Sequence, residues 1–119
     1  MNPIHDSAGS VIAWIHEDVV YNLGGAPVAF VRNGSVIGFG GAHLGRFDQG
    51  HFRDHAGGVV AFTEGAIGGP LKPVRAVTPV WPVRGVVPVR PVAPVAPVRP
   101  VDSLGWSSSR WTDFLMGRA

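Results

Sequence analysis

Residues 1–69 alternate bulky apolar and very small side chains in a pattern that repeats every sixteen positions. Each repeat begins at a glycine (Gly9, Gly25, Gly41 or Gly57) and continues three positions later with a bulky apolar residue, then alanine or glycine, then a second large residue. This period-two pattern predicts a β-strand with the bulky pair on one face and the small residue on the other. The fixed period indicates one supersecondary unit written four times.

A two-residue turn candidate follows each of these strands: Glu17-Asp18, Asn33-Gly34, Gln49-Gly50 and Glu64-Gly65. Asn-Gly is the strongest signal among them, because both central residues of a type I′ turn need positive φ. Short β-branched or alternating runs come next, at residues 19–21, 35–39 and 51–53. In the fourth unit a glycine-rich run, residues 66–69, takes this place. The sequence therefore predicts four sequential β-hairpins, with residues 66–69 as the last return strand.

The four hairpins must pack on one another, because a lone hairpin is marginally stable in water. They can stack as an open solenoid or close into a ring. A ring explains why the small position recurs, because a shared axis leaves no room for side chains, and closure also removes exposed sheet edges. We therefore predict an all-β fold in which the four hairpins of residues 1–69 close in a pseudo-fourfold arrangement.

The segment of residues 70–101, called the arm below, follows a strict triplet. Proline holds one register, with Ala76 and Gly85 in its gaps; valine holds the second after Leu71; and the third is mostly basic or small. Because proline fixes φ and lacks an N–H donor, the arm is expected to form a polyproline II helix with one edge for each register. It is either a spacer or a strand that packs on, or is recognised by, another surface.

Residues 102–119, called the anchor below, regain a mixed composition. Four large apolar side chains stand out in it: Trp106, Trp111, Phe114 and Leu115. Ser109 can cap a short helix on which the last three of these form one apolar face. Such a segment is too short to be stable alone and would expose its rings. We interpret it as a helical or irregular anchor that docks on the β domain, in cis or in a neighbouring copy. Binding to another molecule and a disordered tail are the alternatives.

Several of these features together resemble the bacterial 4-fold β-flower domain family. They are residues 41–47 (Gly-Ala-His-Leu-Gly-Arg-Phe), Gly-x-x-Val-Ala-Phe at residues 25–30 and 57–62, the proline-rich stretch, and Trp-Ser-Ser at residues 106–108. The resemblance covers most of the chain and implies four hairpins about a pseudo-fourfold axis. It brings no established activity, ligand or catalytic residue. Arg46 departs from the repeat, where an aromatic residue is expected.

Composition limits the compartment and the chemistry. The chain has no cysteine, which removes disulfides, thiolate ligands and thiol nucleophiles and fits a reducing cytoplasm. No basic stretch followed by a long apolar segment opens the chain, and no run approaches the roughly twenty apolar residues of a membrane span. We therefore expect a cytoplasmic protein without a membrane span.

Charge is divided unevenly along the chain. Residues 1–69 carry three arginines against six acids, a net charge of −3, whereas residues 70–119 carry seven bases against two acids, a net charge of +5. The two parts should attract each other, so the second part is expected either to fold back on the first or to remain a solvated basic linker. A basic arm that contacts nucleic acid or anionic membrane non-specifically is a further hypothesis, and specific nucleic-acid binding is not expected.

The sequence contains no catalytic, cofactor or metal motif, so we expect neither an enzyme nor a bound cofactor. The histidines at positions 43, 51 and 55 and the carboxylate at position 54 lack the spacing that would place metal ligands together. The favoured function is a non-catalytic protein-interaction or scaffold module, with a self-docking anchor, a homo-oligomer or a protein partner. The alternative is a small-ligand binder with an axial aromatic pocket lined by Trp14, Phe30 and Phe62.

Overall fold

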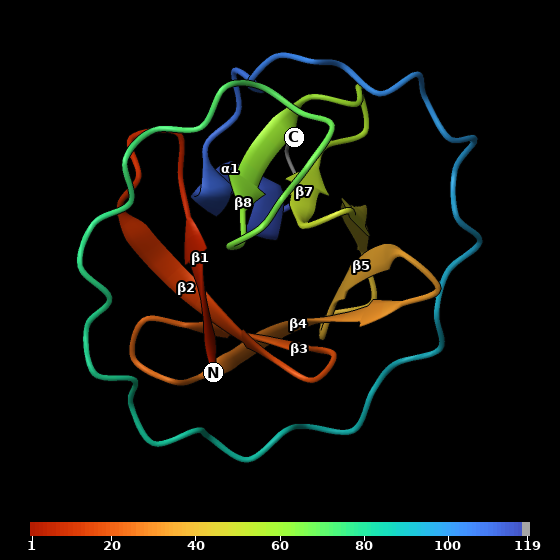
Figure 1. Cartoon of the computed structure of the whole chain (residues 1–119). Helices are drawn as coiled ribbons and strands as arrows, with labels where there is room; N and C mark the ends of the chain where they lie inside the picture. The colour runs from red at the N-terminus through yellow and green to blue at the C-terminus, as the bar shows by residue number, and fades with distance from the viewer. Residues whose placement is uncertain (118–119) are drawn as a thin grey trace.

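The computed structural model describes residues 1–117, which form eight strands and one short helix (Figure 1). The strands are β1 (Asn2–His5), β2 (Val11–His16), β3 (Val19–Asn22), β4 (Pro27–Arg32), β5 (Ser35–Gly38), β6 (His43–Asp48), β7 (His51–Arg53) and β8 (Val59–Phe62). The helix is α1 (Trp111–Leu115). The last two positions of the predicted anchor, 118–119, lie outside the described residues.

The strands form a closed antiparallel barrel in which each strand pairs with its neighbours in the sequence and β8 pairs with β1. This confirms the predicted all-β fold with its hairpins closed into a ring. Three hairpins, β2–β3, β4–β5 and β6–β7, follow the predicted boundaries and turns. Their first turn residues, Glu17, Asn33 and Gln49, have φ of 57°, 51° and 50°, the left-handed conformation that such turns need.

The fourth hairpin is formed differently from the prediction, because residues 66–69 form no strand. The return strand beside β8 is β1, at the start of the chain, which pairs through His5 and Phe62. The physical reason lies in the barrel interior. The other return strands each place a large residue there, whereas the equivalent position in the fourth repeat is Gly68. Ile4 of β1 fills this place with a side chain that is fully buried.

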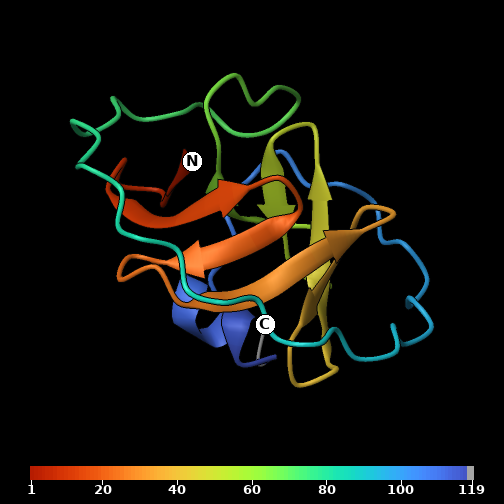
Figure 2. The same ribbon diagram turned by 90° about the horizontal axis from the view of Figure 1, so that it is seen from below.

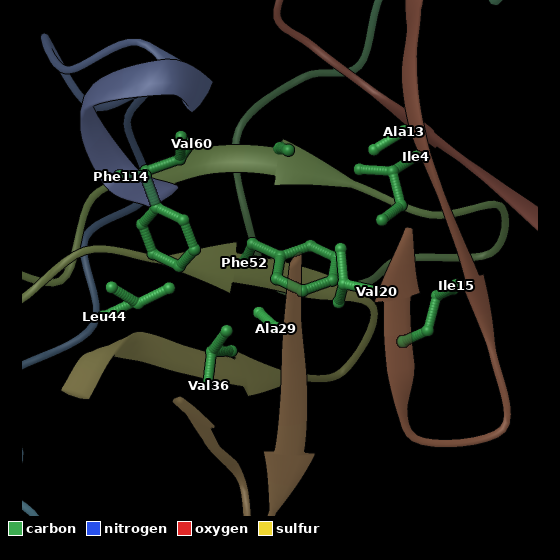
Figure 3. Close-up of a cluster of buried hydrophobic side chains, with 11 residues drawn as sticks. Ile4, Ala13, Ile15, Val20, Ala29, Val36, Leu44, Phe52, Val60 and Phe114 are labelled. Carbon is green, nitrogen blue, oxygen red and sulfur yellow. The ribbon is translucent and has the colours of Figure 1, made fainter. Parts of the chain in front are cut away.

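The barrel interior is packed by pairs of one large and one very small residue (Figure 3). The pairs across neighbouring strands are Ile4 with Ala13, Val20 with Ala29, Val36 with Gly45, and Phe52 with Ala61. All four large members are completely buried. The recurrent tiny residue therefore does line the place of closest approach, as predicted, and its smallness makes room for the large residue on the adjacent return strand.

The prediction that the two bulky residues of each repeat share one face is wrong. The register shifts beside Ile12, Val28, Leu44 and Val60, so each of these residues lacks a partner across its strand pair. Such a β-bulge bends the strand and re-aims its side chains. All four contact the interior cluster at the end of the barrel where α1 lies, whereas the second bulky residue, such as Trp14, points outward into a different cluster.

The arm runs around the outside of the barrel, and α1 lies against one barrel end (Figures 1 and 2). Residues 70–101 contain neither strand nor helix. The arm therefore encircles the barrel as a belt and returns the chain to the β7–β8 side, where the anchor begins. Within residues 1–117, no helix is long and apolar enough to cross a membrane.

Candidate functional site

The arm contacts the barrel at the glycines that define the sixteen-residue repeat. A Cβ at Gly9, Gly25 or Gly57 would overlap an arm carbonyl, that of Val74, Val83 or Val101 respectively. These three glycines also have positive φ, between 84° and 92°, so glycine satisfies both the loop conformation and the close approach. Val74, Val83 and Val101 are separated from one another by multiples of nine residues. Each sixteen-residue repeat of the barrel therefore corresponds to nine residues of the arm, which are three turns of a polyproline II helix.

Backbone hydrogen bonds fix this register. Ala76 N–H donates to Gly9 O at 2.9 Å, Gly85 N–H to Gly25 O at 2.8 Å, and Ser103 N–H to Gly57 O at 3.1 Å. The remaining position of the nine-residue series is Pro94, which has no N–H to donate. The gaps in the proline register thus lie where the arm donates to the barrel. This explains two residues, Ala76 and Gly85, that the triplet pattern left unexplained.

The third register of the arm lies over the outward face of the barrel. Lys72 Nζ lies 5.9 Å from the ring centre of Phe62, and the Arg90 guanidinium lies 5.1 Å from that of Phe30. Arg90 also donates two hydrogen bonds, of 2.7 and 2.8 Å, to the carboxylate of Asp18. The hydrogen bond from Arg90 lowers the pKa of Asp18.

Two further arm bases pair with acids of the barrel: Arg75 with Glu64 at 3.3 Å and Arg99 with Asp48 at 2.9 Å. Of the two alternatives for the basic second part of the chain, the structure shows that it folds back on the acidic first part. At the end of the arm, Asp102 accepts a hydrogen bond of 2.5 Å from Arg46, which lowers the pKa of Asp102. Arg46, the departure from the repeat pattern, therefore makes a polar contact where the other repeats place an aromatic ring.

The second register faces solvent and forms a continuous apolar strip, called the valine edge below. Its members are between 90% and 96% exposed: Leu71, Val74, Val77, Val80, Val83, Val86, Val89, Val92, Val95, Val98 and Val101. The rings of Pro73 and Pro82, in contrast, lie against Gly9 and Gly25. The arm thus turns Pro73, Pro82 and most of its basic side chains toward the barrel and valine away from it.

The structure brings the four predicted anchor residues to the barrel. Trp106 forms a parallel β-bridge with Val59, and its ring centre lies 5.8 Å from that of Phe62. Phe114 is completely buried at the barrel end, while Trp111 and Leu115 pack against the same interior cluster. The ring of Trp111 meets the interior ring of Phe52 edge to face at 5.2 Å.

The predicted Ser109 cap is wrong, because the N-cap residue of α1 is Arg110, without a side-chain hydrogen bond. The polar contacts that fix the anchor come instead from two buried residues that sequence reasoning missed. Arg53 donates to the carbonyls of Gly57 and Ser103, both at 2.7 Å, and Asp54 accepts a hydrogen bond from Ser107. Arg53 lies in the short strand β7 and Asp54 in the loop after it, and these positions gave no signal of this role. Their partners in the anchor, Ser103 and Ser107, lie some fifty residues further along the chain.

The predicted axial pocket does not match the geometry. Trp14, Phe30 and Phe62 are buried, but they alternate with the interior residues and lie on the outer side of the barrel wall, where Arg90 and Lys72 of the arm lie over Phe30 and Phe62. Phe30 contacts Phe39, and Phe62 stacks on His5. The barrel axis is filled by the large and small pairs instead.

A hollow lies at the barrel end, next to α1. It has a volume of about 610 Å³ and is bordered by Ile12, Leu23, Val60, Trp111 and residues 107–110, among others. The helix covers Leu44 and Val60 but leaves the equivalent Ile12 and Val28 only half-buried. This hollow is a shallow groove with an apolar floor and a hydroxyl-rich rim.

The three histidines at positions 43, 51 and 55 do not form one cluster. His43 contacts His55 at 3.0 Å through its Nδ1 and Ser35 at 3.0 Å through its Nε2. Burial, and then the neighbouring His55, lower the pKa of His43. His51 is completely buried elsewhere, against Gly69. In residues 1–117, no three histidine, aspartate or glutamate side chains lie together as metal ligands would.

Comparison with known proteins gives one family. A family model described as 4-fold beta flower protein matches residues 2–115, which include the barrel, the arm and α1. The chain matches no curated protein and no solved structure.

Proposed function

Because the chain belongs to the 4-fold beta flower family over residues 2–115, a match that includes the arm, we propose that barrel, arm and anchor act together as one non-catalytic interaction module. The barrel is the scaffold on which the arm is wound. The valine edge is the surface that the arm offers to a protein partner. The anchor docks in cis and holds the end of the arm in place.

The observation that carries this proposal is the exposure of the valine edge. Eleven apolar side chains, each at least 90% exposed, follow one another at every third residue around the barrel. At roughly 3.1 Å per residue, neighbouring side chains on this edge stand about 9 Å apart. Exposed apolar surface of this extent marks interaction sites in soluble proteins. A protein groove that accepts the edge would gain apolar burial without having to displace the arm.

The charge distribution favours a protein over the basic-arm hypothesis. Arg75, Arg90 and Arg99 of the arm each pair with a carboxylate of the barrel. Nucleic acid or an anionic membrane would have to compete with these carboxylates for the same guanidinium groups. The valine edge, which faces away from the barrel, carries no charged residue. Binding of a protein to the valine edge should therefore depend little on salt concentration.

Docking of the anchor in cis is supported by its contacts with its own barrel. Phe114 is completely buried, and Trp106 continues the β-pairing at Val59. These contacts bury or half-bury the aromatic rings of the anchor, whereas the valine edge stays open to a partner. The filled barrel axis gives no support to a small-ligand site at that place.

Site-specific photo-crosslinking in cells that produce the protein tests the proposal. A benzophenone amino acid at Val92, on the valine edge, should give a discrete protein adduct, whereas the same group at Leu23, an exposed barrel-loop position, should not. Replacing Val86, Val89 and Val95 by threonine keeps side-chain shape and removes apolar surface. This triple variant should reduce the adduct at least tenfold.

The matched control is Val87→Thr, the same substitution at a residue of the third register that is only 36% exposed. It should leave the adduct unchanged. An adduct at Val92 no stronger than at Leu23, or one that survives the triple substitution undiminished, contradicts the proposed function.

A further inference from the structure

The barrel closes at a seam that differs from the other seven strand contacts. Within the described residues, β8 and β1 are paired only at Phe62 and His5, whereas every other neighbouring pair of strands is paired over at least three residues. Closure therefore depends strongly on the side chains that pack around Phe62. A disturbance there acts on the weakest point of the ring.

Two histidines flank Phe62 on the outer side of this seam. His5 stacks on its ring with centres 5.4 Å apart, and His51 of β7 is the cross-strand partner of Phe62 on the other side. Both histidines are almost fully buried, at 1% and 0% exposure. Neither ring nitrogen of either residue has a hydrogen-bond partner in residues 1–117. A proton added to either ring would be buried without a hydrogen-bond acceptor.

The beginning of the arm lies directly on this cluster. A Cβ at Gly69 would lie 2.7 Å from Cε1 of His51 and 3.1 Å from its Cδ2, so the backbone there is packed on the imidazole. Lys72 continues the cover, with its Nζ 5.9 Å from the ring centre of Phe62. The Arg53 guanidinium donates to Gly68 O at 3.2 Å. The path of the arm onto the barrel thus depends on the His51 imidazole and on the Phe62 ring on which His5 stacks.

The surrounding charges reinforce this dependence. His51 faces the bases Lys72 and Arg53 and the acids Asp48 and Asp102. Burial is the main cause that lowers the pKa of His51, to about 4, and the two bases lower it further against the opposing acids.

His5 faces the base Arg75 and the acids Asp6 and Glu64. Burial and then Arg75 lower its pKa, and the two acids act in the opposite direction.

We propose that protonation of His51 and His5 opens the β1–β8 seam and releases the start of the arm from the barrel. The contact between arm and barrel would then depend on pH. The inference deepens the proposed function, because release of the arm removes the valine edge from its scaffold. The opening itself needs no partner. It can therefore be tested whether or not the valine edge binds a protein.

The direction of the effect follows from proton linkage. A histidine whose pKa falls from 6.5 to about 4 on folding contributes stability that is complete above pH 6.5 and is lost as the pH falls toward 4. For His51 alone, the opening equilibrium constant should rise about 30-fold between pH 7.5 and 5.0. Carboxylates such as Asp18, whose pKa is lowered, lose their stabilising effect below about pH 5, outside the range between pH 7.5 and 5.0.

Amide hydrogen exchange measured by NMR on the full chain tests the proposal. The Ala76 N–H, bonded to Gly9 O at the start of the arm, reports release. Its protection factor should fall about 30-fold from pH 7.5 to 5.0 in the wild type and much less in His51→Phe. If that variant does not fold, His51→Met serves the same purpose. His16→Phe, at a strand position whose side chain is 35% exposed, is the control and should keep the wild-type fall.

Titration of the imidazole Cε1–H signals provides an independent check. His51 should remain neutral well below pH 6 in the folded protein. A His51 that titrates near 6.5, or an Ala76 protection factor that is the same at both pH values, overturns the proposal. So does a fall in protection that persists in full when His5 and His51 are both replaced by phenylalanine.

Discussion

Position 45 carries glycine where the three equivalent positions carry Ala13, Ala29 and Ala61. A Cβ at Gly45 would lie 2.6 Å from Cε1 of Phe114 and would overlap the carbonyl oxygen of Arg53. The choice of glycine is therefore set by two neighbours, the backbone carbonyl of Arg53 on β7 and the ring of Phe114 in the anchor. The sequence predicted a small residue at this position, but the difference between alanine and glycine depends on how closely these two neighbours approach in the folded barrel.

Gly45→Ala should lower the free energy of unfolding by about 1 to 3 kcal/mol, because the β6–β7 pair must shift away from the Arg53 carbonyl and α1 must shift away with Phe114 to admit the methyl group. Urea unfolding followed by tryptophan fluorescence measures the change. Gly40→Ala is the matched control, since a Cβ there would meet nothing within 4 Å. Equal stabilities of the two variants would show that the anchor ring does not require this space.

At the scale of elements, the arm has the most regular sequence pattern, but its conformation depends on contacts with the barrel. The triplet predicts three edges, yet three equal edges do not say which one faces the barrel. The answer comes from the hydrogen bonds of Ala76 and Gly85 and from the ion pair between Arg90 and Asp18. The loop glycines of the barrel are spaced by sixteen residues, whereas the arm residues that contact them are spaced by nine. Because the two spacings differ, neither can be predicted from the other in the sequence.

Ala76→Pro should destabilise the protein by about 1 kcal/mol, because it removes the N–H that donates to Gly9 O while keeping a polyproline II conformation. Ala93→Pro is the control, at an arm residue with no such hydrogen bond to the barrel in the described structure. It should be neutral or slightly stabilising, since proline reduces the entropy of the unfolded chain. Thermal unfolding of both variants decides the matter, and an equal melting temperature for the two would refute a donor role for Ala76.

At the scale of the whole molecule, the two ends of the chain complete a barrel that the repeats alone leave unfinished. β1 supplies the return strand beside β8, and α1 covers half of one barrel end. Phe114 contributes the largest buried side chain of the anchor and contacts Phe52 in the interior, with ring centres 6.4 Å apart. Barrel stability should therefore depend on a residue that lies outside the repeats.

Phe114→Ala should reduce the free energy of unfolding by about 3 to 5 kcal/mol, the usual effect of removing a fully buried phenylalanine ring. Met116→Ala, close by but 65% exposed, should change it by less than about 0.5 kcal/mol. Denaturant unfolding followed by circular dichroism of the strands measures both. Should Phe114→Ala prove as stable as Met116→Ala, the anchor would not contribute to the barrel.

The sequence predicted the period of the barrel, three of its turns and the three edges of the arm, because these depend on φ preferences and side-chain size within a few residues. It also identified the apolar anchor residues, since Trp111, Phe114 and Leu115 form a face that needs a partner. Three features could be seen only in the folded protein: β1 replaces residues 66–69, the side chains of Trp14, Phe30 and Phe62 lie on the outer side of the barrel wall, and valine faces solvent. Each of these depends on which distant segment fills a given space, and local preferences carry no information about that competition.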